Sequence, residues 1–399
     1  LKINYPSTEA VMKSLFILTV FFALSVFSYS NQMVDKKPIK NNSIQLALLL
    51  DTSGSMDGLI EQAKSQLWKI VNELATSKKD GKPVNLNVAL YEYGKQSIPI
   101  DEGYLRNIVP FTQDLDKISD ELFKLRTNGG DEYCGKVILN AVENLQWNKS
   151  NDNLKIIFIA GNEPFTQGSI DYKTACQKAI KKGIVVNTIF CGNYDEGVQT
   201  MWKDGADLAD GKYMNIDHNA AIVHIDAPQD AEIIKLGQEL NKTYIAFGSA
   251  GREKKEMQAE QDANSMSLSP GVMVERSVTK SGGQYKNSGW DLVDAKNEGS
   301  IKIEELKDED LPDEMKKMSL HERKTYVNKM EKERAQIQNK IKNQNAQQNM
   351  EKVMEKLEAR AAEGKNIQDT MKKGGSESNQ GDNGNGSDNQ GGNTNNGNN

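Results

Sequence analysis

The sequence is poor in histidine, and its 399 residues contain only His218, His224 and His321. A Ser–His catalytic pair needs an imidazole close to the nucleophile, and nothing in the sequence directs these residues at a candidate serine such as Ser53. Asp51 and Ser55 stand where a nucleophile elbow would have glycines. An aspartyl-phosphate phosphatase would need a second acid where Ser53 stands. We therefore expect no enzyme activity, and a hydrolase is the least favoured alternative.

The chain also lacks a strong charge of either sign. Its formal net charge of −6 is mild for 399 residues. Proteins that bind nucleic acids usually carry a basic patch or a high positive charge. We therefore expect no nucleic-acid partner.

The sequence also lacks an apolar run long enough to span a membrane readily. Residues 15–27 are apolar, but this stretch is shorter than the roughly 20 residues that a spanning helix needs. It follows Met12-Lys13 and precedes Ser28-Tyr29-Ser30, an order typical of a secretory signal and its cleavage site. Residues 1–30 are predicted to be an N-terminal extension and signal peptide. The mature chain would be exported, periplasmic or extracellular, without a stable membrane span; the alternative is an uncleaved anchor.

The sequence does contain a strongly apolar stretch that ends in oxygen-bearing side chains. Residues 44–50 are almost entirely aliphatic, and Asp51-Thr52-Ser53-Gly54-Ser55 follow directly. Such a run favours a strand buried on both faces of a parallel sheet. Alternate residues of an extended segment point the same way, and ligands bind beyond the carboxyl ends of parallel strands. Asp51, Ser53 and Ser55 can thus converge on a hard cation such as Mg²⁺, Mn²⁺ or Ca²⁺.

Strand and helix patterns alternate after this stretch. The predicted strands are 84–93, 156–160, 184–190 and 212–215, with a short one at 107–109. The predicted helices are 57–76, 115–126, 171–182, 196–208 and 230–244, and another follows Cys134. This alternation predicts an α/β fold with a doubly wound, mostly parallel, Rossmann-like sheet over residues 42–248.

The composition changes after residue 248. Residues 249–302 contain few apolar runs, and we expect an irregular linker there. Residues 303–373 have a helical but strongly polar pattern, which favours an exposed charged helix or a weak helical hairpin. A sustained heptad, which would define a coiled coil, cannot be traced. Residues 374–399 hold eight glycines and nine asparagines, so they are predicted to be a disordered tail.

The Asp-x-Ser-x-Ser pattern of Asp51, Ser53 and Ser55 resembles the metal-ion-dependent adhesion site (MIDAS) of von Willebrand factor A (VWA) domains. The resemblance covers the whole α/β region and implies a bound Mg²⁺, or else Mn²⁺ or Ca²⁺. Two positions depart from the family. Where the family has a Thr after Gly-Gly, this sequence has Asp131. Where the family has an Asp after the fourth strand, this sequence has Gly161. We interpret the two changes as an exchange that preserves the charge of the site.

The resemblance therefore assigns the metal to Asp51, Ser53, Ser55 and Asp131. Further ligands or rim residues would be Thr127, Asn162, Glu163 and the loop 192–197. In the family, an acidic side chain of a partner protein completes the coordination of the ion. The chain would then be an exported module for adhesion or complex assembly. The alternative is a metal-independent envelope scaffold that acts through the C-terminal helices.

The cysteines leave two interpretations open. The three residues Cys134, Cys176 and Cys191 allow one disulfide and leave one thiol. Cys176 and Cys191 are both predicted near the carboxyl edge of the sheet, so a bridge between them is feasible if their Cα atoms lie within ~7 Å. The alternative is three small buried hydrophobic residues.

Overall fold

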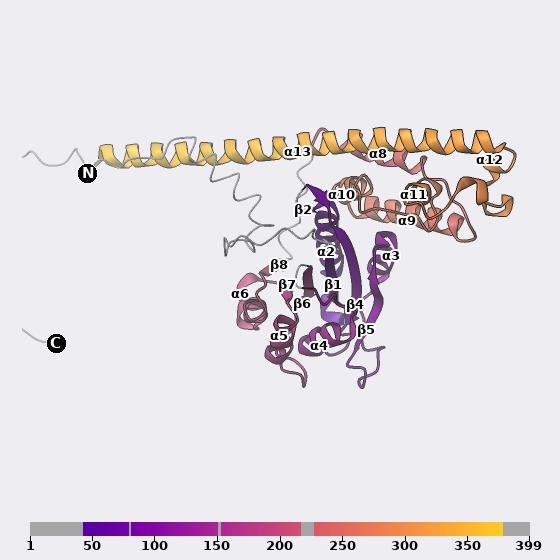
Figure 1. The fold of residues 1–399 in the computed structure, drawn as a ribbon. Helices are drawn as coiled ribbons and strands as arrows, with labels where there is room; N and C mark the ends of the chain where they lie inside the picture. The colour runs from indigo at the N-terminus through magenta and orange to yellow at the C-terminus, as the bar shows by residue number, and fades with distance from the viewer. Residues whose placement is uncertain (1–42, 80, 151–152, 217–226, 378–399) are drawn as a thin grey trace, which may run out of the picture. The chain divides into compact units, whose positions relative to one another are not determined.

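The computed structural model describes residues 43–79, 81–150, 153–216 and 227–377. The predicted N-terminal extension and signal peptide, the histidines at 218 and 224, and the predicted tail beyond residue 377 lie outside these ranges. Figure 1 shows the arrangement of the helices and strands. None of the helices in the described ranges is both long and apolar enough to cross a membrane.

A six-stranded sheet forms the centre of the α/β region, in the order β5-β4-β1-β6-β7-β8. Its strands are β1 (Ser43–Asp51), β4 (Asn85–Tyr93), β5 (Leu105–Thr112), β6 (Leu154–Gly161), β7 (Ile184–Cys191) and β8 (Tyr213–Ile216). Only β5 runs antiparallel to its neighbour, and the other pairings are parallel. A separate antiparallel pair joins β2 (Lys78–Lys79) to β3 (Lys82–Pro83). The predicted doubly wound, mostly parallel fold is confirmed.

Helices cover both faces of the sheet because the residues of β1 alternate between two apolar clusters. Leu46, Leu48 and Leu50 pack in one cluster, whereas Ala47 and Leu49 pack in the other. The first cluster includes side chains of α2 (Ile60–Thr76), α3 (Leu115–Lys124), α8 (Asp230–Asn241) and α10 (Pro270–Lys280). The second includes side chains of α4 (Cys134–Asn144), α5 (Tyr172–Lys181) and α7 (Trp202–Asp207). Strand β1 is therefore buried on both sides, as its sequence predicts.

The helix predicted at 196–208 is instead two short helices. They are α6 (Tyr194–Gln199) and α7, and Met201 between them has a left-handed φ of 71°. A left-handed residue interrupts the helical hydrogen-bond pattern, so the chain changes direction at this point.

The prediction that residues 249–302 form an irregular linker is wrong. This segment contains α9 (Gly251–Leu268), α10 and α11 (Leu292–Asn297), and α9 and α10 contact α3, α2 and α8. The buried positions of α9 are Gly251, Gln258, Gln261, Asp262 and Ser265. Because this buried face is polar, the helix has no apolar stripe, which is the signal that sequence-based prediction of amphipathic helices uses.

Buried polar contacts join this segment to the α/β region. The Arg276 side chain of α10 is 1% exposed and donates to Asp116 Oδ1 of α3 at 2.8 Å and to Asp262 Oδ1 of α9 at 2.6 Å. Lys280 Nζ contacts Asp262 Oδ2 at 2.6 Å, and the Tyr285 hydroxyl donates to the second oxygen of Asp116. Residues from three helices therefore share one charged network with little access to water.

The chain continues through two 3-10 turns, Ile303–Glu305 and Asp308–Asp310, and α12 (Asp313–Lys316) into α13 (Leu320–Glu377). Figure 1 shows α13 as one unbroken helix. It is neither a hairpin nor fully exposed, because Val327 and Ile341 are buried. Arg334 donates to Asp291 at 2.6 Å and lies 4.0 Å from the centre of the Tyr244 ring. The helix also extends to Glu377, four residues into the predicted tail.

Of the two interpretations left open for the cysteines, the Cys176–Cys191 bridge is not formed, since all three cysteines are free and buried. Cys191 packs in the cluster on one face of the sheet, and Cys176 packs in the cluster on the other face. The sheet itself therefore separates the two sulfur atoms. The alternative of small buried hydrophobic residues describes these positions.

Candidate functional site

The candidate site lies where β1 ends. Asp51 is the last residue of this central strand and is fully buried. Its Oδ1 accepts a hydrogen bond from the Ser53 amide at 2.8 Å, but its buried Oδ2 has no hydrogen-bond partner among the described residues. An unpaired buried polar atom is costly. This oxygen is therefore positioned for a ligand from outside the chain.

Two glycines enclose the Asp51 carboxylate closely. A Cβ at Gly94, which has a φ of 76°, would stand 2.7 Å from Asp51 Oδ1. A Cβ at Gly161 would stand 2.9 Å from Asp51 Oδ2 and 2.5 Å from the Tyr93 hydroxyl. Real Cβ atoms do not make such contacts. The absence of side chains at both positions is thus a condition for placing Asp51 here.

Two serine hydroxyls lie next to each other beside this carboxylate. The Oγ atoms of Ser53, which is buried, and Ser55, which is exposed, are 2.9 Å apart. Ser55 Oγ donates to Asn162 Oδ1 at 3.0 Å, and Asn162 Nδ2 donates to the Ser55 carbonyl at 3.1 Å. The structure thus brings together Asp51, Ser53, Ser55 and Asn162 from two loops at the carboxyl edge of the sheet.

The second acid at this site is Glu132 and not Asp131, the residue that the sequence interpretation selected. Glu132 is only 5% exposed, and its Cγ lies 3.0 Å from the point where a Gly94 Cβ would stand, next to Asp51 Oδ1. Asp131 is exposed, and its Oδ2 accepts a hydrogen bond from the Tyr133 hydroxyl at 3.0 Å. The structure therefore brings Glu132, the neighbour of the predicted Asp131, close to Asp51.

Burial shifts the titration of both acids. It raises the pKa of Asp51 to about 7; hydrogen bonds from Ser53 oppose this shift, and the nearby charge of Glu132 adds to it. Burial likewise raises the pKa of Glu132 to about 7, with a hydrogen bond from Ser53 opposing and the charges of Glu163 and Asp131 adding. Each carboxyl is thus less acidic than usual, because burial disfavours its charged form.

The remaining predicted residues form hydrogen bonds outside this group. The Thr127 hydroxyl donates to the Asp57 carboxylate near the start of α2. The Glu163 carbonyl accepts a hydrogen bond from Trp202 Nε1 at 2.8 Å. The negative charge of the Glu163 side chain raises the pKa of Glu132. In the loop 192–197, the Asn193 side chain caps α6 by accepting from the Asp195 amide at 2.9 Å. None of these hydrogen bonds involves Asp51, Ser53 or Ser55.

The residues of the site fit a hard divalent cation. In the ranges that the structure describes, no group of three or more His, Cys, Asp or Glu side chains is arranged as a metal site. The donors here are instead two carboxylates, two hydroxyls and one amide oxygen, which suit Mg²⁺, Mn²⁺ or Ca²⁺ rather than a soft metal. The unpartnered Asp51 Oδ2 is the observation that supports this fit.

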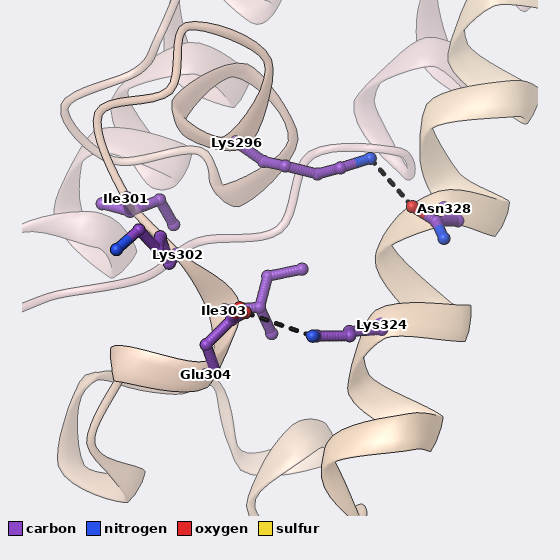
Figure 2. A pocket seen from close by; sticks show the side chains of 7 residues that line it. All are labelled: Lys296, Ile301, Lys302, Ile303, Glu304, Lys324 and Asn328. Atoms are coloured by element: carbon purple, nitrogen blue, oxygen red, sulfur yellow. Dashed lines mark hydrogen bonds and ion pairs between the residues drawn. The ribbon is translucent and has the colours of Figure 1, made fainter.

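A pocket of about 300 Å³ lies away from this site, between the segment that follows α11 and the start of α13. Figure 2 shows Lys296 reaching toward Asn328 and Lys324 reaching toward Glu304. Lys302, which also lines it, pairs with Glu305 at 2.7 Å. Because its lysines already have partners on the chain, the pocket offers no uncompensated charge to a ligand.

Residues 45–217 match the family model of the von Willebrand factor type A domain, and no curated protein matches the chain. One similar solved structure is an aerotolerance-related membrane protein from Bacteroides fragilis, at 15% identity over 44% of this chain and 92% of that chain, with a TM-score of 0.32. BatB from Bacteroides thetaiotaomicron is 16% identical over 44% of this chain and 91% of that chain, with a TM-score of 0.34.

Another similar structure is proximal thread matrix protein 1 from the mussel byssus, which has a zinc-occupied MIDAS motif. It is 10% identical over 45% of this chain and 43% of that chain, with a TM-score of 0.33. The match to the family model, together with the observed order of strands, shows that this chain contains a VWA domain.

Proposed function

We propose that the VWA domain of this exported protein binds a partner protein through a divalent cation, Mg²⁺ or else Mn²⁺ or Ca²⁺. Asp51, Ser53 and Ser55 would hold the ion. The observation that carries the proposal is the buried Asp51 Oδ2, which has no hydrogen-bond partner in the described part of the chain and lies beside two adjacent hydroxyls. The proposed role is binding and includes no catalysis.

The geometry separates an inner from an outer part of the site. Asp51 and Ser53 are buried and fix the inner side, whereas Ser55 and Asn162 form its accessible side. When bound, the cation supplies a positive charge and an open coordination position that an acidic side chain of the partner can take. A single contact of this kind orients the partner, and most of the affinity comes from the surrounding surface.

Titration calorimetry of the full chain with Mg²⁺, Mn²⁺ and Ca²⁺ tests the metal. We expect the wild type to bind at least one ion and Asp51→Ala to bind none, because the buried carboxylate is lost. Asp207→Ala is the matched control, since Asp207 is exposed and pairs with Lys203 on the same helix. No binding by the wild type, or equal binding by Asp51→Ala, would reject the metal.

A pull-down from envelope extract, with and without a chelator, tests the partner. Capture by the wild type that chelator and Asp51→Ala both abolish is the expected result. Capture that survives both but disappears when α13 is deleted would instead favour a scaffold that acts through the C-terminal helices.

A further inference from the structure

We infer that Glu132 is the second carboxylate ligand of the cation, supplied by the loop before α4. This inference rests on the proposed metal site and deepens it. It changes the expected ligand set, because Glu132 takes the place that the sequence interpretation gave to Asp131.

The position of Glu132 supports this assignment. Three side chains surround the place that a Cβ at Gly94 would occupy. Asp51 Oδ1 lies 2.7 Å from this place, the Glu132 Cγ 3.0 Å and the Ser53 Cβ 3.2 Å. The Glu132 amide donates to Gln167 Oε1 at 2.8 Å, which holds the backbone of the loop in place. Three oxygen-bearing side chains are therefore gathered against one glycine.

The position matched to the family's Asp cannot hold an acid in this chain. A Cβ at Gly161 would collide with Asp51 and with the Tyr93 hydroxyl, which donates to the Ala160 carbonyl at 3.0 Å. Tyr93 is fully buried and cannot withdraw easily. Position 161 therefore supplies no carboxylate, whereas Glu132 lies close to Asp51 from the loop before α4.

The charges of the surroundings lead to the same assignment. Two other buried acids pair with a cation: Glu92 with Arg106 at 2.5 Å, and Asp116 with Arg276 at 2.8 Å. In the described ranges, no lysine or arginine forms an ion pair with Asp51 or Glu132. Two adjacent buried carboxylates without a counter-charge are unfavourable. A divalent ion would neutralise both.

Mn²⁺ titration of the full chain tests the inference, with binding measured by calorimetry and by the rise in melting temperature that saturating Mn²⁺ produces. Glu132→Gln keeps the shape of the side chain and removes its charge. We expect it to weaken Mn²⁺ binding by at least about 10- to 100-fold, since a loss of that size is typical even for a residue that only supports a metal ligand. Asp131→Asn is the matched control. It should weaken binding less than about 2-fold, because its exposed charge is screened.

Glu132→Asp provides a second measurement if Glu132→Gln folds poorly. It keeps the charge and withdraws the carboxylate by one methylene group, so we expect an intermediate loss of affinity. Wild-type affinity in both Glu132 variants, with binding still abolished in Asp51→Ala, would overturn the role of Glu132 and leave the metal site intact. A wild type that binds no Mn²⁺ would overturn both. A loss of affinity in Asp131→Asn but not in Glu132→Gln would overturn the assignment in favour of Asp131.

Discussion

Replacing Arg276 by methionine would remove the central cation of the network that joins α10 to α9 and α3. Its guanidinium donates to Asp116 and Asp262, and it also contacts the Gln258 carbonyl at 3.2 Å. The Arg276 side chain is 1% exposed, and that of Asp116 is 3% exposed. Methionine fills much of the same volume but supplies no donor. The variant therefore isolates the loss of charge and hydrogen bonds from the loss of packing.

The size of the effect follows from what is left behind. Lys280 would still pair with Asp262, but Asp116 would keep only the Tyr285 hydroxyl. Removing one partner of a buried ion pair typically destabilises a protein by about 3–5 kcal/mol, because an uncompensated charge stays buried. With a slope of about 3 kcal/mol per M of urea, the unfolding midpoint would fall by about 1–1.7 M.

Urea unfolding followed by circular dichroism and tryptophan fluorescence measures this shift. Lys178→Met is the matched control, since Lys178 and Glu143 form an exposed pair between α5 and α4 at 2.7 Å. Exposed pairs contribute about 0–1 kcal/mol, so this control should hardly move the midpoint. Limited proteolysis of Arg276→Met should cut first within α9 or α10, which lose their attachment to α3.

The reasoning would be refuted if Arg276→Met unfolded within about 1 kcal/mol of the wild type, since that is the effect of an exposed pair. Residues 249–302 would then behave as the loosely attached linker that their composition predicts. A larger loss in Lys178→Met than in Arg276→Met would contradict the argument directly.

Two further predictions concern buried positions in the VWA domain. All three cysteines are buried, and burial raises the pKa of Cys176 to about 12. Alkylation without reductant, followed by intact-mass measurement, should therefore label three thiols in denaturant and almost none in the native protein. Fewer than three labelled thiols in denaturant would indicate a disulfide. Gly94→Ala should lower the free energy of unfolding, measured in urea, by at least about 1 kcal/mol more than Gly248→Ala does. Both glycines have a positive φ. However, a Cβ at Gly94 would collide with Asp51, whereas a Cβ at Gly248 would meet no atom within 4 Å. Equal losses in the two glycine variants would show that Asp51 is not confined as the structure indicates.

The parts of the fold that could be predicted are those in which burial and apolarity coincide. Strands β1, β6 and β7 are runs of aliphatic residues covered on both faces, so their sequences alone indicate a parallel sheet. The motif Asp51, Ser53 and Ser55 was predictable for a related reason. It follows directly from the end of β1, where the strand fixes the direction of the side chains.

The parts that could not be predicted depend on loop conformation or on buried polar groups. Asp131 and Glu132 are neighbours in one loop, and sequence alone does not reveal which of them turns inward. Only the fold shows that Tyr133 holds Asp131 on the surface. Helix α9 was missed because it buries Gln261 and Asp262 instead of an apolar stripe, and α10 also buries the charged side chain of Arg276. Their burial depends on partners such as Asp116, which lies more than a hundred residues away in the chain.

The candidate metal site and residues 249–302 lie at opposite ends of the same elements. The candidate ligands lie beyond the carboxyl end of β1, whereas Gln284 accepts from the amide of Leu86 near the start of β4. In the same way, Thr279 of α10 donates to Asn72 near the end of α2, and the loop before α2 carries Ser53 and Ser55. We therefore expect charged groups near residues 249–302 to act mainly on stability, and those at the opposite edge to act on the proposed binding. A substitution in one group should leave the other property nearly unchanged, as is usual for sites that are distant and share no partners.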